Sequence, residues 1–418
     1  PLCNQPDAGL FLVTAGGTGV TSTSNKALFK DDGNAVSLLL RTGMSVTELG
    51  GAQPSAFHDI VQNNGSNLIA ISMRLKLSTA PPVTATNDSG LLMLNHAGTL
   101  TDATPPREGA DTDPDFGTED GKLGQFTGRA ANGLNSRVHF GAMFIPTAGI
   151  PVPALFMTNS SGTATSRVAK AGMIANGTGQ ATFASFPALS HMNAHALFRA
   201  TLKGAATTAN EGIWRDSGVG LVKLVLKGED LGGGVRIARI LKFWPVDAGG
   251  VGQIMLQVTL TGPGVTLANN SALLLRQSSG SYLVLLRTGD RAPGAGPAKV
   301  RKFQAVDVDP LNGHYAVLGS LSGAPASSNQ ALWAGQTTMG NDSTRQLERL
   351  PTLRLRKGDR YMSFETPLGT IRSLSFKPAV DPTGAGGRGL AQTVGSGGHV
   401  MVYILTDGSV TELVRLKL

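Results

Sequence analysis

The sequence predicts an all-β protein, a seven-bladed β-propeller with four antiparallel strands per blade and about 60 residues per repeat. Three observations support this prediction. Three short sequence marks recur in the same order along the 418 residues, glycine and proline punctuate short apolar runs (55 Gly and 22 Pro), and no segment shows a sustained helical period. Four-stranded units of this length suit blades, because in a ring each blade covers the apolar face of its neighbour.

The first mark is a short apolar strand that runs into a glycine turn, as in ALFKDDG and ALFMTNSSG. It occurs seven times. Counted from Phe29, the third residues of successive copies lie 64, 63, 58, 60 and 59 positions apart. We expect these residues to be buried at equivalent places in successive blades: Phe29, Met93, Phe156, Trp214, Leu274 and Trp333.

The second mark ends the next strand at a glycine, as in LLLRTG and VLLRTG, and its last copy is the C-terminal ELVRLKL. The third mark is an Asn/Asp/Gly turn that opens a strand of small residues, from DAGLFLVTA to TGAGGRGLAQTV. One more strand, carrying a phenylalanine, precedes that turn. The marks place residues 1–418 in a single propeller domain with repeats at roughly 1–44, 45–110, 111–173, 174–229, 230–290, 291–359 and 360–418.

The composition limits the function only loosely. The net charge is +8, but the Lys and Arg residues are scattered at strand ends, a pattern typical of solubility rather than of nucleic-acid binding. Cys3 is the only cysteine, which excludes an intrachain disulfide and a cysteine metal site. No apolar run is long enough to span a membrane, and no signal-peptide pattern is present, as expected of a mature exported chain.

The three marks together resemble those of secreted bacterial proteins with tandem NxxGxxAF repeats, in which a turn Asn, a Gly and an Ala-aromatic pair recur. The segment Asn64–Ile71 follows this spacing with Asn in place of Gly and Ile in place of Phe, and Gly313–Val317 and Gly252–Leu256 keep its second half. The resemblance covers essentially the whole chain. It implies secretion and a repeat architecture, and it implies no catalytic residues.

The best candidate for a metal site is the acidic run from Asp111 to Asp120. The alternate carboxylates of Asp111, Asp113 and Asp115 suit a shared hard cation such as Ca²⁺, although the run is not an EF-hand loop. The alternative is a solvated loop between two blades. Calcium is therefore the one cofactor that the sequence suggests.

No motif of a catalytic site is present, so we expect a non-enzymatic protein with no catalytic residues. His191 and His195 have the spacing of paired ligands on a helix, but they flank a turn and read as ordinary turn residues. The other histidines, among them His139, are isolated in the sequence. Trp214 and Trp333 fall on apolar marks, which favours core packing over sugar stacking.

Two function classes remain open. The first is an extracellular or cell-surface structural protein, in which propeller rings assemble into a surface layer or filament by strand or loop contacts between subunits. The second is an extracellular binding module that recognises a glycan, ion or protein through loops on one propeller face. Neither class needs nucleic acid or a membrane span.

The chain ends favour the first class. The first repeat lacks the front of its first strand, which would leave an edge of unpaired backbone groups. The gap could be filled by residues upstream of Pro1, by the C-terminal ELVRLKL, or by a strand of a neighbouring molecule, and the last case would extend into a filament. The residues that we assign to such an assembly contact are Leu2, Cys3, Leu416 and Leu418.

Overall fold

The structure is a computed structural model with an all-β fold, as predicted. Among the described residues, the only helices are two short 3₁₀ turns, η1 (Thr47–Leu49) and η5 (Ala326–Ser328), so none could cross a membrane. The described residues are 9–31, 34–62, 68–95, 105–112, 120–132, 137–158, 165–247, 252–337, 350–363, 366–389, 393–395, 397–408 and 410–418.

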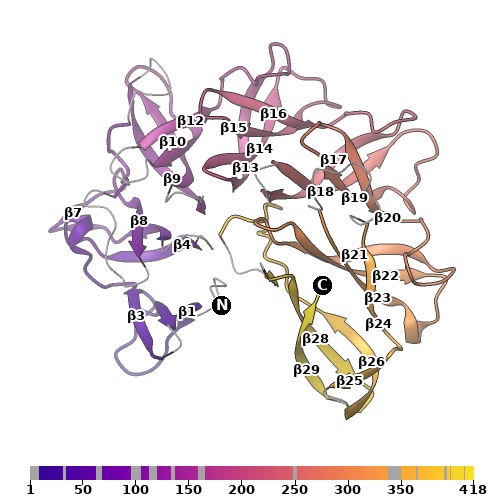
Figure 1. Ribbon diagram of the computed structural model, residues 1–418. Coiled ribbons are helices and arrows are strands. Elements are labelled where there is room, and N and C mark those ends of the chain that lie inside the picture. The colour runs from indigo at the N-terminus through magenta and orange to yellow at the C-terminus, as the bar shows by residue number, and fades with distance from the viewer. Residues whose placement is uncertain are drawn as a thin grey trace. The chain divides into compact units, whose positions relative to one another are not determined.

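The chain divides into two compact units (Figure 1). The first unit comprises Pro1–Val225 and the short segment Arg388–Ala391. Its sheets are the first sheet, β1-β2-β3, then β4-β5-β8 with the small β6-β7 pair, and two four-stranded sheets, β9 to β12 and β13 to β16. The strands are β1 (Gly9–Thr14), β2 (Lys26–Asp31), β3 (Val36–Arg41), β4 (Pro54–Gln62), β5 (Leu68–Leu75), β6 (Ser78–Thr79), β7 (Pro82–Val83), β8 (Ser89–Asn95), β9 (Gly121–Asn132), β10 (Val138–Pro146), β11 (Val152–Thr158), β12 (Thr165–Lys170), β13 (Thr182–Met192), β14 (His195–Lys203), β15 (Glu211–Asp216) and β16 (Leu221–Leu226).

The second unit comprises Leu226–Gly387 and Gln392–Leu418. It contains two four-stranded sheets, β17 to β20 and β21 to β24, and a five-stranded last sheet of β25 to β29. The strands are β17 (Arg236–Val246), β18 (Gln253–Thr261), β19 (Ser271–Arg276), β20 (Tyr282–Arg287), β21 (Lys299–Val308), β22 (His314–Ser322), β23 (Gln330–Gln336), β24 (Thr352–Arg356), β25 (Arg360–Ser363), β26 (Thr366–Ser375), β27 (Val394–Gly395), β28 (His399–Thr406) and β29 (Thr411–Lys417).

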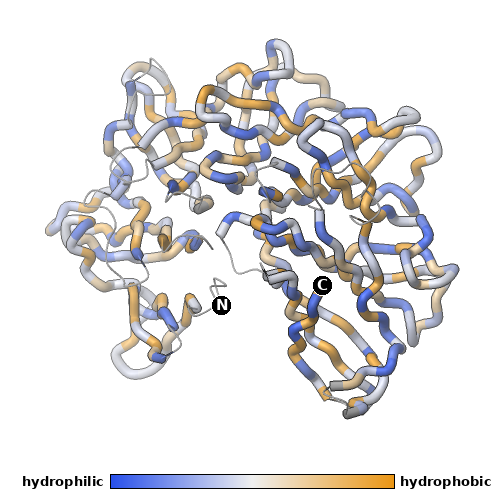
Figure 2. The backbone as a smooth tube through the Cα atoms, viewed as in Figure 1, coloured by the Kyte–Doolittle hydropathy of each residue, from blue (hydrophilic) through white to orange (hydrophobic). Residues whose placement is uncertain are grey.

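The strand order of the four-stranded sheets is the predicted antiparallel meander, and Figure 2 shows short hydrophobic and hydrophilic stretches alternating along the strands. The expectation of four strands in every repeat is correct for four sheets and wrong elsewhere within the described residues. In the second sheet the PPREG mark forms only an isolated bridge between Gly90 and Arg107. The count of seven blades and their closure into one ring remain predictions.

Within each unit, the core lies between successive sheets. We call the face of a sheet that packs on the next sheet in the chain its leading face, and the opposite face its trailing face. The second residue of the first mark lies on the leading face and the third on the trailing face. Thus Leu273 and Leu275 of β19 pack in one cluster with Ala331 and Trp333 of β23.

The predicted core residues Phe156, Trp214, Leu274 and Trp333 are fully buried, as expected. Met93 is buried as well, but its predicted register is off by one residue. Leu92, not Met93, lies on the trailing face, because Leu92 shares a cluster with Leu28 of the first sheet whereas Met93 packs with Phe156. Phe29 is the exception to full burial. It is only half-buried.

The third mark of the last repeat, Thr383–Val394, was predicted as a turn that opens a strand of small residues, and the strand is wrong for the described residues. Only the two-residue β27 forms at its end. Gly384, Gly387 and Gly389 have φ angles of 92°, 64° and 92°, which no strand accommodates. Instead, the Asp381 side chain accepts hydrogen bonds from the amides of Thr383 (2.9 Å) and Ala385 (3.0 Å) and builds a turn.

Candidate functional site

Among the described residues, the second-position residue of the last sheet is exposed, and this distinguishes it from those of the other sheets. Tyr403 occupies the second position of the first mark on β28, yet it is 49% exposed. Its neighbours Val402 and Ile404 point to the trailing face and are fully buried. The second-position residues of the other sheets are at most 1% exposed: Leu28, Leu91, Leu155, Ile213, Leu273 and Leu332.

Tyr403 belongs to an apolar patch with a cationic rim. Across the strand pair it lies directly opposite Leu413 of β29, which is 51% exposed. Met401 and Leu405 flank Tyr403 on the same face and are half-buried. We call Met401, Tyr403, Leu405 and Leu413 the last-sheet patch. At its edge the Arg415 guanidinium lies 3.3 Å from Nδ1 of His399, and Lys417 is exposed.

The first sheet has a matching exposed surface on its trailing face. Phe29 on β2 pairs with Phe11 of β1 on one side and with Leu38 of β3 on the other. Leu38 is 47% exposed and Val36, on the same face, is 64% exposed. We call Phe11, Val13, Phe29, Val36 and Leu38 the first-sheet patch.

The residues that the sequence assigned to assembly do not form either patch within the described part of the chain. Leu416 pairs with Val400, and both Leu416 and Leu418 pack on the core cluster of the trailing face. The Leu418 amide donates to the Gly398 carbonyl at 2.8 Å. Leu2 and Cys3 lie outside the described residues. On β28 and β29, the residues that are free for contact are Tyr403 and Leu413. Sequence reasoning missed them, although Tyr403 occupies the position in the first mark that six buried aliphatic residues occupy in the other sheets.

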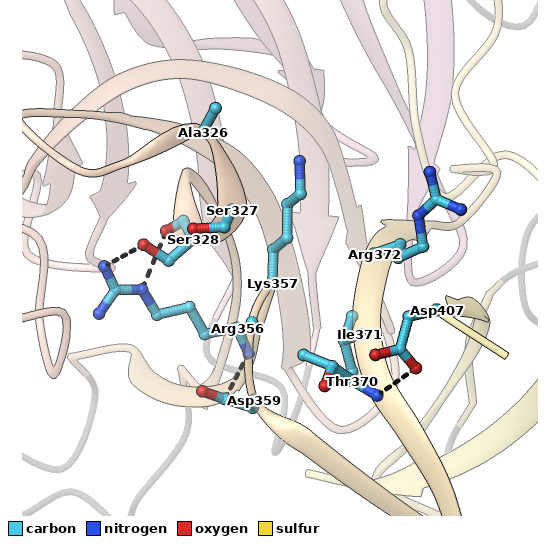
Figure 3. Close-up of a pocket in the computed structure, with 11 residues that line it drawn as sticks. Ala326, Ser327, Ser328, Arg356, Lys357, Asp359, Thr370, Ile371, Arg372 and Asp407 are labelled. Atoms are coloured by element: carbon cyan, nitrogen blue, oxygen red, sulfur yellow. Dashed lines mark hydrogen bonds between the residues drawn. The ribbon is translucent and has the colours of Figure 1, made fainter.

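A second candidate site is an open pocket of about 700 Å³ beside the last sheet (Figure 3). Arg356 is held in its wall, because its Nε donates to the Ser328 carbonyl at 3.0 Å. The Thr370 amide donates to Asp407 at 2.9 Å, and this hydrogen bond lowers the pKa of the Asp407 carboxyl. Lys357 and Arg372 extend from the same wall, and their side chains form no hydrogen bond or ion pair with the described part of the chain, so the pocket offers two free cations.

The wall residue Lys357 stands at a position of the second mark where two other sheets have a threonine. In the first sheet, the hydroxyl of the buried Thr42 accepts a hydrogen bond from the Lys26 amide at 3.2 Å. In the β17 to β20 sheet, Thr288 does the same for the Ser271 amide at 3.1 Å. Lys357 takes this position at the pocket, and its longer side chain reaches outward instead of closing the junction.

The predicted calcium site lies largely outside the described residues. Asp111 is exposed and its carboxylate lies 3.7 Å from the Lys122 ammonium. Asp113 and Asp115 lie outside the described residues. Among the residues that are described, no group of three His, Cys, Asp or Glu side chains is arranged to hold a metal ion. The calcium prediction therefore remains untested.

Three histidines that look unrelated in the sequence lie close to one another in the first unit. His139 of β10 is fully buried, and burial lowers its pKa to about 3, assisted by the positive charges of His191, His195 and Arg137. Burial also lowers the pKa of His191 to about 4. His195 Nδ1 lies 3.6 Å from the Asp216 carboxylate. The expectation that His191 and His195 are ordinary turn residues missed this neighbourhood.

One more buried polar site belongs to the first unit. The guanidinium of Arg388 lies 2.8 Å from the Asp59 carboxylate, and both side chains are less than one tenth exposed. The second carboxylate oxygen of Asp59 accepts a hydrogen bond from the Ala130 amide at 3.0 Å, and Arg388 donates to the Ala130 carbonyl at 3.2 Å. The arrangement ties β4, β9 and the Gly-rich segment together, which is a structural role.

Comparisons with solved structures give matches of low identity. TolB from Acinetobacter baumannii is 13% identical with a TM-score of 0.36, over 79% of this chain and 61% of that one. Trypanosoma rangeli sialidase is 9% identical with a TM-score of 0.35, over 77% and 52%. The periplasmic gluconolactonase PpgL of Pseudomonas aeruginosa is 11% identical with a TM-score of 0.29, over 98% and 97%. This chain thus spans less than two thirds of the first two proteins.

The sequence itself matches no protein with a curated description. A protein family described as a family of unknown function, DUF7453, matches residues 106–368, which is more than half of the chain. The match covers the sheets from β9 to β24. The chain therefore belongs to this family of unknown function, DUF7453.

Proposed function

We propose that the chain is a non-enzymatic structural protein of the cell exterior that assembles with further copies of itself into a surface layer or filament. The observation that carries the proposal is the exposure of Tyr403 and Leu413 on the leading face of the last sheet. An apolar patch with a polar rim is typical of a protein interaction site.

The position of the patch supports this role better than its size does. The residues at the same position of the other sheets are buried, so the side chains of this face suit a second β-sheet rather than water. Tyrosine adds to this, because it buries a large apolar area while keeping a polar tip. A face of this kind gains free energy when a sheet packs on it.

Replacing Tyr403 with Glu tests the proposal. A carboxylate in the centre of the patch would be desolvated without a partner on association, so we expect self-association to weaken at least about tenfold. Light scattering after size-exclusion chromatography should show a mass that rises with concentration for the unaltered protein and a monomer for Tyr403→Glu.

The matched control is Leu267→Glu, which places the same charge on a loop residue that is 93% exposed and remote in sequence from the patch. This variant should assemble like the unaltered protein. A protein that remains monomeric at every concentration would contradict the proposal, and so would a Tyr403→Glu variant that still assembles.

The pocket of Lys357 and Arg372 favours a second function, an extracellular binding module for an acidic ligand such as a uronic-acid glycan. Two cations beside serine hydroxyls suit carboxylate and hydroxyl groups of a sugar. We expect oligogalacturonate to bind in calorimetry and the double variant Lys357→Ala, Arg372→Ala to lose at least about tenfold in affinity. Binding that is unchanged in this variant, or no binding at all, would exclude the pocket as this site.

A further inference from the structure

We infer that the acidic ligand of the pocket is a linear chain of several uronic acids, which extends from Lys357 and Arg372 along β26 to Lys302 and Lys377. We call these four residues the cationic strip. The inference rests on the second proposed function, the binding module, and names the form of its ligand. All four residues belong to the second unit, along the junction of its sheets β21 to β24 and β25 to β29.

A row of neighbouring residues crosses the sheet β21 to β24 and has a lysine at each end. Lys302 of β21 pairs with Ser320 of β22, which pairs with Gln330 of β23. The amide of Lys357, just after β24, donates to the Gln330 carbonyl at 2.9 Å. Neighbouring strands are about 4.8 Å apart, so the backbones of the two lysines are about 14 Å apart. This spacing suits a ligand with several carboxylates in a line better than one with a single carboxylate.

Strand β26 of the next sheet runs beside this row. The Gln330 side chain accepts a hydrogen bond from the Leu374 amide at 2.8 Å and donates to the Leu374 carbonyl at 2.9 Å. Arg372 precedes Leu374 by two residues and lines the pocket together with Lys357. This end of β26 therefore brings a second cation to the Lys357 end of the row.

The other end of β26 leads to the Lys302 end of the row. Phe376, just after β26, packs in one cluster with Ala305 of β21. Lys377 is the next residue and is exposed, as Lys302 is. Within the described residues, no hydrogen bond or ion pair engages the charged group of either lysine. The cationic strip thus has two free cations at each end.

The corresponding row of the sheet β4-β5-β8 has its charges compensated. There the Glu108 amide donates to the Ser89 carbonyl at 2.9 Å, as the Lys357 amide does to Gln330. Ser89 pairs with Arg74, whose guanidinium lies 2.9 Å from the Asp88 carboxylate. An acid therefore stands where the pocket has a lysine, and the cation of the row has a partner in the protein. The row of the β21 to β24 sheet leaves its cations for a ligand.

The carboxylates of the pocket do not block an anion. Asp359 and Asp407 each accept a hydrogen bond from a backbone amide at 2.9 Å. Figure 3 shows the charged ends of Lys357 and Arg372 pointing away from the Asp359 carboxylate. None of the described residues that line the pocket is aromatic, so none could stack on a nucleobase. This favours an acidic glycan over a nucleic acid.

Calorimetry with the dimer and the hexamer of galacturonate tests the inference. We expect the hexamer to bind at least about tenfold more tightly, because its further carboxylates reach Lys302 and Lys377. The double variant Lys302→Gln, Lys377→Gln should lose this gain and keep its affinity for the dimer. The matched control Arg236→Gln, Arg239→Gln removes two exposed cations from β17 and should bind the hexamer like the unaltered protein.

Two further ligands test the chemistry. A methyl-esterified hexamer keeps the sugar rings without their charges and should not bind. Binding of this ester as tight as that of the acid would overturn the inference. So would a single-stranded DNA hexamer that binds more tightly than the glycan and depends on the same two lysines, because the partner would then be a nucleic acid.

The remaining outcomes separate the inference from the proposed function. Equal affinities for dimer and hexamer, or a hexamer affinity that Lys302→Gln, Lys377→Gln leaves unchanged, would overturn the inference. The proposed binding function would still stand if Lys357→Ala, Arg372→Ala weakens binding. A protein that binds neither galacturonate removes the binding function itself.

Discussion

Replacing Arg388 with Met is expected to lower the free energy of unfolding by about 3–5 kcal/mol, because it leaves a buried carboxylate without its counter-charge. Asp59 and Arg388 are separated by 329 residues and meet at 2.8 Å, with 9% and 7% of their side chains exposed. Met matches the length of the Arg stem, so the change removes the charge and its hydrogen bonds more than the packing. Urea unfolding followed by intrinsic fluorescence measures the difference.

Two further variants separate the ion pair from a general loss of packing. The double variant Arg388→Met, Asp59→Asn removes both charges and keeps an amide oxygen for the Ala130 amide, so most of the lost stability should return. Arg372→Met, at an exposed position of β26, should change the stability by less than about 0.5 kcal/mol. A single variant Arg388→Met that loses less than about 1 kcal/mol would show that the pair is not effectively buried.

The strands and most of the core could be predicted because they follow local rules. Short alternating runs and glycine turns repeat along the chain, and the apolar third residue of each first mark was predicted as core. In the last repeat a competing local feature explains the failure, because Gly384, Gly387 and Gly389 favour positive φ over a strand. The one-residue change of register at Leu92 is seen only in the packing of its sheet.

The candidate sites were much harder to predict, because each depends on strand pairing or on what covers a face. Asp59 and Arg388 lie in no common motif. The exposure of Tyr403 depends on what packs against its face of the sheet, which composition does not show. Sequence alignment of the first marks does show that a tyrosine replaces leucine or isoleucine there, and this is the signal that could have indicated the patch.

His139 also stands where other sheets have apolar residues. In the strand pairing it lies opposite Met157, and the residues in the same register are Ala70, Leu197, Met255 and Ala316, all fully buried. Within the described residues neither ring nitrogen of His139 has a hydrogen-bond partner. The charged groups that face it are His191 of β13, His195 of β14 and Arg137 beside β10, and their positive charges all disfavour a second proton on the ring.

We therefore expect the protein to lose stability as the pH falls below neutral, and the variant His139→Leu to lose less. The pKa of His139 is about 3 in the folded protein and 6.5 in the unfolded chain. The unfolded chain therefore takes up a proton first as the pH falls from 6.5 towards 3. Each pH unit in this window lowers the free energy of unfolding by up to about 1.4 kcal/mol for this group, or about 2 kcal/mol by pH 5. Urea unfolding at pH 7, 6 and 5 should show that the free energy of unfolding of His139→Leu rises relative to that of the unaltered protein by that amount as the pH falls. His191 leaves part of the acid sensitivity in both proteins. Parallel pH dependences of the two proteins would mean that His139 gains a proton partner in the folded state, and the explanation by burial would be wrong.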